Sequence, residues 1–123
     1  MNNEETVVIF LDDERYINDV TWVQYPENKK VFAYRTFEQF KWVVDELMPK
    51  LLLNRILWSF DHDLQDFDED DNEKTGYDCV KYLCDKLVDL NYDVNHLQVV
   101  AHTKNPVGKA NIEKYVNNFK DIS

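Results

Sequence analysis

The sequence predicts a three-layer α/β fold built on a four-stranded parallel sheet. Two observations support this prediction. Short apolar runs rich in β-branched and aromatic residues, typical of buried strands, alternate with longer segments of helical periodicity. Such alternation implies parallel strands joined by right-handed crossovers. A length of 123 residues suits one domain, spanning 1–123.

Four segments are predicted strands because they are short, apolar and bounded by polar residues. They are residues 6–11, 31–34, 56–60 and 97–101. The connection between the first two, residues 14–30, is ambiguous. It contains a turn at Pro26 and fits either a short helix or irregular structure.

Three helices are predicted from apolar residues at helical spacing and from residues that cap helix ends. The first covers 37–48, after a capping box of Thr36 and Gln39, and has Pro49 at its end. The second begins near Thr75.

The third helix covers roughly 106–119, where Asn105 can cap and Pro106 suits the first helical position. In chain order, the first two strands are joined by the ambiguous segment 14–30, and a helix follows each of the second, third and fourth strands. This order is flavodoxin-like.

An acidic stretch lies between the third strand and the second helix. Residues 61–73 hold eight carboxylates in thirteen positions. Such charge density resists packing, so we expect a solvated loop. Its part 66–73 is a candidate docking surface for a protein partner, and it would repel a nucleic-acid backbone.

Composition narrows the class of protein further. The formal net charge of −10 disfavours nonspecific nucleic-acid binding, so a phosphate ligand needs a metal or a few placed cations. Cys79 and Cys84 match neither a redox pair nor a zinc knuckle, and we expect reduced thiols on a helix, one or both in the core.

The polar start MNNEET is unlike a signal peptide, and no apolar run is long enough to cross a membrane. We therefore expect a soluble, cytoplasmic protein.

Residues able to do chemistry follow three of the four strands. Asp12 and Asp13 follow the first strand, and Asp61 follows the third. Because the carboxyl ends of parallel strands meet at one edge of a sheet, these carboxylates should converge. Carboxylates are ligands for Mg²⁺ or Mn²⁺, so these three are candidate metal ligands. The alternative for the Asp pair is that Asp simply ends a strand or caps a helix.

Two histidines also follow predicted strands: His62 comes directly after Asp61, and His102 comes after the last strand. His102 is a candidate general acid or base near neutral pH, and its alternative is a histidine that bonds a loop carbonyl. Either Asp61 or Asp63 is a candidate to bind metal while the other orients a base or accepts a proton. For His62 we favour a packed ring with satisfied nitrogens over catalysis.

Phosphate ligands are also predicted after the last strand. The hydroxyl of Thr103 is a candidate donor to a phosphate oxygen. The helix that begins near Pro106 offers free N–H groups to an anion, and Lys104 or Lys109 adds positive charge. The alternative is an ordinary helix start.

Two family resemblances follow from these residues. The general one is to response-regulator receiver domains, where an acidic pair holds Mg²⁺ and a later Asp accepts a phosphoryl group. Asp61 stands in the place of that acceptor, and Thr103 stands where the receiver has a hydroxyl residue. No fifth strand follows, so the receiver's Lys-bearing strand end is missing.

The closer resemblance is to cyclic-phosphate-processing receiver-like domains, a family linked to RNA-end repair. Four segments between positions 11 and 112 resemble it in order. They are Leu11-Asp12-Asp13-Glu14-Arg15, Ser59-Phe60-Asp61-His62-Asp63-Leu64, Thr75-Gly76-Tyr77-Asp78, and the run from His102 to Ile112. The resemblance implies a receiver-derived fold that acts on, or binds, a cyclic phosphate.

The resemblance also implies roles for single residues. An acidic pocket would be formed by Asp12, Asp13, Asp61 and Asp63, and phosphate would be handled by Arg15, His102 and Asn105. One departure is Gln65 with the acidic insert, where Gly is expected soon after Asp63-Leu64. This difference from the family affects the shape of the pocket rim.

Three functional hypotheses result. The first is a metal-dependent phosphoesterase that opens a 2′,3′-cyclic phosphate on an RNA end or nucleotide, with His102 protonating the leaving ribose oxygen. The second is a signalling receiver phosphorylated on Asp61. The third is a non-catalytic module that binds a nucleotide or a partner.

Overall fold

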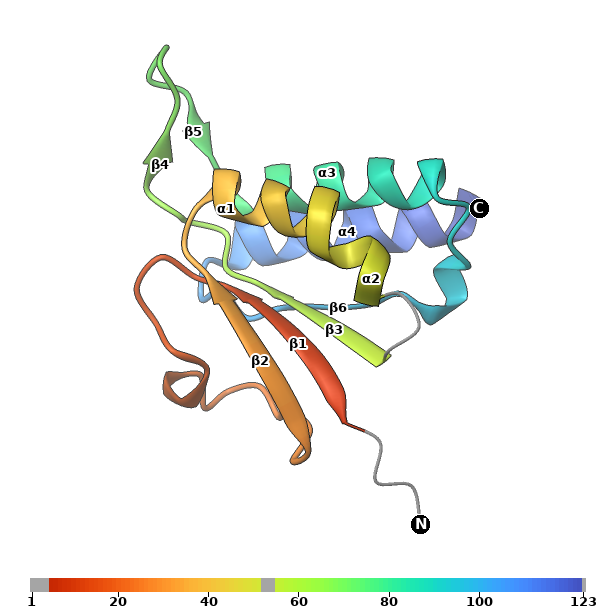
Figure 1. Cartoon of the computed structure of the whole chain (residues 1–123). Helices are drawn as coiled ribbons and strands as arrows, with labels where there is room; N and C mark the ends of the chain where they lie inside the picture. The colour runs from red at the N-terminus through yellow and green to blue at the C-terminus, as the bar shows by residue number, and fades with distance from the viewer. Residues whose placement is uncertain (1–4, 52–54, 123) are drawn as a thin grey trace.

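The main sheet of the computed structural model has four parallel strands in the order β2-β1-β3-β6 (Figure 1). The structure describes residues 5–51 and 55–122. The four strands are β1 (Thr6–Leu11), β2 (Lys29–Tyr34), β3 (Arg55–Phe60) and β6 (Gln98–Ala101). The predicted α/β class and flavodoxin-like order are confirmed, and the described residues contain no fifth strand in this sheet.

The register brings the carboxyl ends of three strands level with one another. Leu11 lies opposite Phe60, and Phe60 lies opposite Ala101. The ladder continues one residue further, since Asp61 N donates to Leu11 O at 2.8 Å and His102 N donates to Phe60 O at 2.9 Å. The residues after these strands are therefore held by the sheet itself.

Helices cover one face of the sheet (Figure 1). They are α1 (Phe37–Trp42), a π-helical turn (Val43–Leu47), α2 (Met48–Leu51), α3 (Gly76–Asp89) and α4 (Pro106–Ile122). Their apolar faces pack on the sheet around fully buried Phe40, Leu83 and Ile112. Both cysteines are free and buried on α3, as the sequence predicts.

The first helix runs further than the sequence predicts. We expected its end before Pro49, but α2 continues through Pro49 to Leu51. Proline lacks an N–H and crowds the preceding turn, and the wider π-helical turn lies directly before it. Thr36 caps α1 by accepting a hydrogen bond from Gln39 N, while the Gln39 side chain accepts from Arg35 N rather than closing the expected box.

An irregular segment covers the other face of the sheet. Residues 12–28 contain only one short 3₁₀ helix, η1 (Ile17–Asp19), which resolves the ambiguity of this region. A second apolar cluster lies beneath it, built on Val8 and Phe10 of β1 and on Val20. The third layer of the fold is therefore a loop that packs by its side chains.

The acidic stretch is mostly exposed, as expected of a solvated loop, but it also contains two short strands. A small antiparallel hairpin of β4 (Asp66–Phe67) and β5 (Glu73–Lys74) projects beyond the sheet (Figure 1). The Asp68 carboxylate accepts two N–H bonds within the turn, a local pattern that offsets the charge density. The Asp66 carboxylate accepts from the first N–H of α1 at 2.8 Å. Docking of a protein partner on this hairpin stays a prediction.

Candidate metal and phosphate site

A polar pocket of about 170 Å³ lies at the carboxyl ends of the central strands, where the strand order reverses between β1 and β3. Ligands of open α/β sheets bind in this position. The lining residues are Asp12, Asp13, Glu14, Arg15, Asp61, Asp63, Gln65, Thr103, Lys104 and Asn105. Most of the residues that the sequence singles out therefore share one cavity.

Three carboxylates converge in this pocket. One oxygen each of Asp12, Asp13 and Asp61 lies within 4.8 Å of the other two. Asp12 and Asp61 are buried, with exposed fractions of 1% and 5%, while Asp13 is half-buried. A set of three close carboxylate oxygens is the donor chemistry that a hard divalent cation prefers.

Crowding of like charges disfavours ionisation of two of these acids. Burial, then the neighbouring Glu14, Asp12 and Asp61, raises the pKa of Asp13. Burial and the Asp12 charge raise the pKa of Asp61, although a hydrogen bond from the Thr103 hydroxyl opposes them. A bound cation would relieve this repulsion, so the electrostatics of the described residues fit a metal.

Asp12 differs from its neighbours because it is richly hydrogen-bonded. Burial alone would raise its pKa, but bonds from His102 and from the N–H groups of Arg15 and Glu14 lower it overall. Both backbone N–H groups donate to Oδ1 at 2.9 Å. The oxygen Oδ2 faces His102 and lies 3.6 Å from Arg15 Nη1. Asp12 is thus held as a carboxylate.

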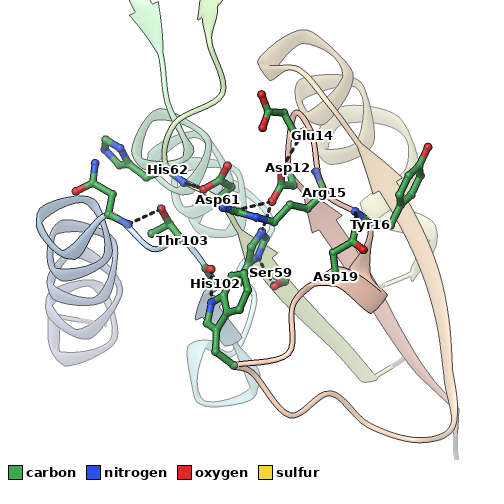
Figure 2. A network of polar contacts seen from close by, with 12 residues as sticks. Asp12, Glu14, Arg15, Tyr16, Asp19, Ser59, Asp61, His62, His102 and Thr103 are labelled. Atoms are coloured by element: carbon green, nitrogen blue, oxygen red, sulfur yellow. Dashed lines mark hydrogen bonds and ion pairs between the residues drawn. The ribbon is translucent and has the colours of Figure 1, made fainter.

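His102 lies below Asp12 in the view of Figure 2. Its ring is fully buried, stacks on Phe10 at 4.5 Å between centroids, and places Nε2 3.0 Å from Asp12 Oδ2. Its Nδ1 lies 2.7 Å from Ser59 Oγ, which lies 2.7 Å from the Tyr25 hydroxyl. Both ring nitrogens are therefore engaged, and the hydrogen bond that the ring makes to a pocket residue is the one to Asp12.

Asp63 forms the outer edge of the pocket. Hydrogen bonds from His62 and Asn105 lower its pKa, with His62 Nδ1 at 3.0 Å and Asn105 Nδ2 at 3.1 Å. The His62 ring packs against the bare backbone of Gly108, where an added Cβ would lie 2.3 Å from its Cγ. Asn105 Oδ1 also accepts from Gly108 N at 3.0 Å, as the predicted cap of α4.

Positive charge on the pocket wall comes from Arg15 and Lys104. Thr103 lines the same wall, where its hydroxyl bonds Asp61 and accepts from Asn105 N at 3.1 Å. Lys109, a predicted phosphate ligand, is exposed on α4 and does not line the pocket.

Sequence reasoning missed several contributors to this site. Ser59 carried a signal, because a hydroxyl inside an otherwise apolar strand needs a buried partner. Tyr25 and Trp22 carried none, because they lie in the irregular segment where no periodicity assigns a direction. Arg35 also escaped notice; its Nη1 donates to the backbone oxygens of Asp12 and Arg15, both at 3.1 Å, and braces the loop after β1.

The fold and the pocket together define a receiver-like α/β domain with an acidic site at its strand ends. Residues 7–118 match the family model described as the cyclic-phosphate processing receiver domain, and the chain belongs to this family. The resemblance seen in the sequence is confirmed. Comparisons with curated proteins and with solved structures gave no match. Within the described residues, no helix is long and apolar enough to span a membrane.

Proposed function

We propose that this domain binds a 2′,3′-cyclic phosphate, at an RNA end or on a nucleotide, and hydrolyses it with a divalent cation. The observation that supports this most is the meeting of three carboxylates, Asp12, Asp13 and Asp61, with the cations of Arg15 and Lys104 in one pocket. Carboxylates alone repel phosphate, so this combination suits a metal-bridged phosphate ligand.

The residues to hold Mg²⁺ or Mn²⁺ are Asp12, Asp13 and Asp61. When bound, such a cation polarises a phosphoryl oxygen and lowers the pKa of bound water. Family membership supports the ligand class, because cyclic-phosphate processing is the role in the family's description.

The chain's own residues divide the remaining work. Arg15 and Lys104 bind and orient the phosphate, and they balance charge that builds on its oxygens. Asp63 lies on the pocket edge, where its carboxylate is placed to accept a proton from attacking water and to return it to the ribose oxygen that leaves; its lowered pKa keeps it ionised but makes it a weak base. For His102, predicted as the acid for the leaving ribose oxygen, the buried ring favours a positioning role that keeps Asp12 ionised and oriented.

Phosphorus NMR of the protein with a 2′,3′-cyclic nucleotide, or with an RNA that ends in this group, tests the proposal. We expect loss of the cyclic-phosphate signal only when Mn²⁺ is present, and no loss with Asp61→Asn. The product signals show which phosphate–ribose bond opens. Equal turnover by Asp61→Asn would refute the assignment of the pocket, whereas saturable binding without product would identify a non-catalytic binder.

A signalling role is the second candidate, because Asp61 lies at the end of β3 beside the Thr103 hydroxyl in a receiver-like fold. In this role the Asp61 carboxylate attacks the phosphorus of a phosphoryl donor. The bond from phosphorus to the donor's bridging oxygen breaks, and this oxygen leaves with the rest of the donor. Incubation with acetyl phosphate and Mg²⁺ gives acetate and a protein one phosphoryl group heavier. Intact mass detects this gain, and its absence argues against the role.

A further inference from the structure

An exposed tryptophan joins the two cations of the pocket. Trp22 lies in the irregular segment that covers the sheet, and 40% of its surface is exposed. The guanidinium carbon of Arg15 lies 5.3 Å from its ring centroid, and Lys104 Nζ lies 4.3 Å from it. Its Nε1–H donates to His102 O at 2.7 Å. The indole is thus fastened to the end of β6, directly before the loop that carries Lys104.

The two cations are not equivalent. Arg15 faces the Asp12 carboxylate at 3.6 Å, so part of its charge is already balanced. Among the residues that the structure describes, no carboxylate forms an ion pair with the Lys104 ammonium; its contact is the indole ring. A long, exposed lysine otherwise samples many rotamers, and a cation–π contact restricts it to the pocket wall.

The pocket as a whole is acidic, with five carboxylates against the two cations. An incoming anion is therefore repelled unless a metal and a well-placed cation oppose the carboxylates. Lys104 is the cation whose charge is free to do this, because Arg15 is shared with Asp12.

We propose that Lys104 binds the phosphate group of the ligand and that Trp22 is the positioning residue that holds Lys104 ready for it. This inference rests on the proposed function. It gives Lys104 and Trp22 a joint role in binding the ligand, whereas the sequence alone gives Trp22 no role. The ligand is an anionic phosphate ester whose phosphate lies between the carboxylate cluster and the loop after β6.

Replacing Lys104 by Gln should change the affinities for phosphate and for Mn²⁺ in opposite directions. Lys104→Gln removes an anion ligand, so phosphate affinity falls by about tenfold. The same change removes a positive charge beside the carboxylates, so affinity for Mn²⁺ alone rises, by about twofold. Structural damage to the pocket would weaken both, which separates a binding role from a structural one.

Isothermal titration of the full chain measures these affinities. The probes are inorganic phosphate and cytidine 2′,3′-cyclic phosphate in Mg²⁺, and Mn²⁺ alone. Lys114→Gln, an exposed lysine further along α4, is the control of matched charge. Trp22→Leu should weaken phosphate binding by about two- to fivefold and leave Mn²⁺ binding near wild type, while Trp42→Leu, at an exposed tryptophan of α1, changes neither.

The double variant Trp22→Leu/Lys104→Gln tests whether one residue acts through the other. If Trp22 positions Lys104, its replacement costs little once Lys104 is neutral. Additive losses would overturn the positioning role. Phosphate binding by Lys104→Gln equal to that of Lys114→Gln, or no phosphate binding by the wild type, would overturn the whole inference. Binding of inorganic phosphate that depends on Lys104, without binding of the cyclic nucleotide, would support it and refute the proposed function instead.

Discussion

His102 Nε2 lies 3.0 Å from Asp12 Oδ2, and both side chains are almost wholly removed from solvent. The pair joins the end of β6 to the end of β1 across the strand that separates them. Since the other nitrogen of the ring meets Ser59, the imidazole is fixed at both ends. Asp12 therefore faces the pocket with an orientation set from inside the protein.

Replacing His102 by Leu should be costly. The change leaves the buried carboxylate of Asp12 and the Ser59 hydroxyl each short of a partner, and we expect a loss of about 3 kcal/mol in the free energy of unfolding. Ser59→Ala removes only one hydroxyl from the network and should cost about 1 kcal/mol. Urea denaturation of both variants measures the difference, and equal losses would contradict the view that Asp12 depends on the ring.

Replacing Asp61 by Asn should stabilise the metal-free protein. The substitution removes a buried charge that Asp12 repels, and we expect a gain on the order of 1 kcal/mol. Asp63→Asn is the matched control with the opposite sign, because His62 and Asn105 stabilise the Asp63 carboxylate. Thermal unfolding in EDTA reports both changes. A loss of stability in Asp61→Asn would show that its contact with Thr103 outweighs the repulsion.

The advantage of Asp61→Asn should depend on pH. Burial and the Asp12 charge raise the pKa of Asp61 in the folded protein above its ordinary value of 3.8, so the folded state binds the proton more tightly than the unfolded state. The contribution of Asp61 to wild-type stability therefore falls as the pH rises from about 3.8 through the folded pKa, and the variant lacks this contribution. The stability difference should be smallest below this window and constant above it. Unfolding free energies of both proteins across this range, without metal, give the curve.

Addition of a divalent cation should reverse the ranking of these two proteins. A cation that binds only the folded state stabilises it in proportion to the logarithm of its concentration over its dissociation constant. Wild-type protein should gain about 2.7 kcal/mol at a hundred times that constant. Asp61→Asn lacks one of the three ligands and should gain much less. Equal shifts of Tm in Mn²⁺ would remove Asp61 from the metal site.

The two glycines of the chain should tolerate an added methyl group to different degrees. A Cβ on Gly76 would lie 1.8 Å from the backbone oxygen of Asp61, which cannot move without the sheet, so Gly76→Ala should cost about 3 kcal/mol. A Cβ on Gly108 would meet the His62 ring and would lie 2.7 Å from the His62 Cβ, which rotation of the ring does not move, so the backbone must shift and the cost should be about 2 kcal/mol.

A second background checks the origin of the Gly108 effect. In a His62→Ala protein the clash with the ring is gone but the clash with the Cβ at position 62 stays, so the penalty of Gly108→Ala should shrink without becoming a gain. Chemical denaturation of the four proteins in this cycle decides. An unchanged penalty at Gly108 would mean that something other than the His62 ring limits the position.

The sequence predicts those parts of the molecule where a local pattern and a general rule act together. Strand β1 follows from its β-branched residues, and Asp12 and Asp61 come together because parallel strands end at one edge. The passage of α2 through Pro49 is not predictable in this way, since it depends on a π-helical turn with no sequence signature. The acidic hairpin likewise depends on hydrogen bonds that one carboxylate, Asp68, accepts from the N–H groups of its own turn.

The candidate site likewise has residues that the sequence predicts and residues that it does not. Its carboxylates are predictable because each directly follows a strand. Trp22 and Tyr25 are not, because their directions are set by tertiary packing of a segment without periodicity. The burial of His102 behind Asp12 is accompanied by its stacking on Phe10, a contact between strands of the same sheet that spacing alone does not reveal.

The irregular segment 12–28 has two roles, because it covers part of the core and also contributes to the ligand pocket. It covers the apolar cluster of Val8 and Phe10, and it also supplies Arg15 to the pocket, with the Trp22 ring beside Arg15. Any ligand that immobilises this segment must also protect the apolar residues beneath it from solvent. Amide hydrogens on that side of the sheet should therefore exchange more slowly when the pocket is filled, which makes this half of the core a reporter of occupancy.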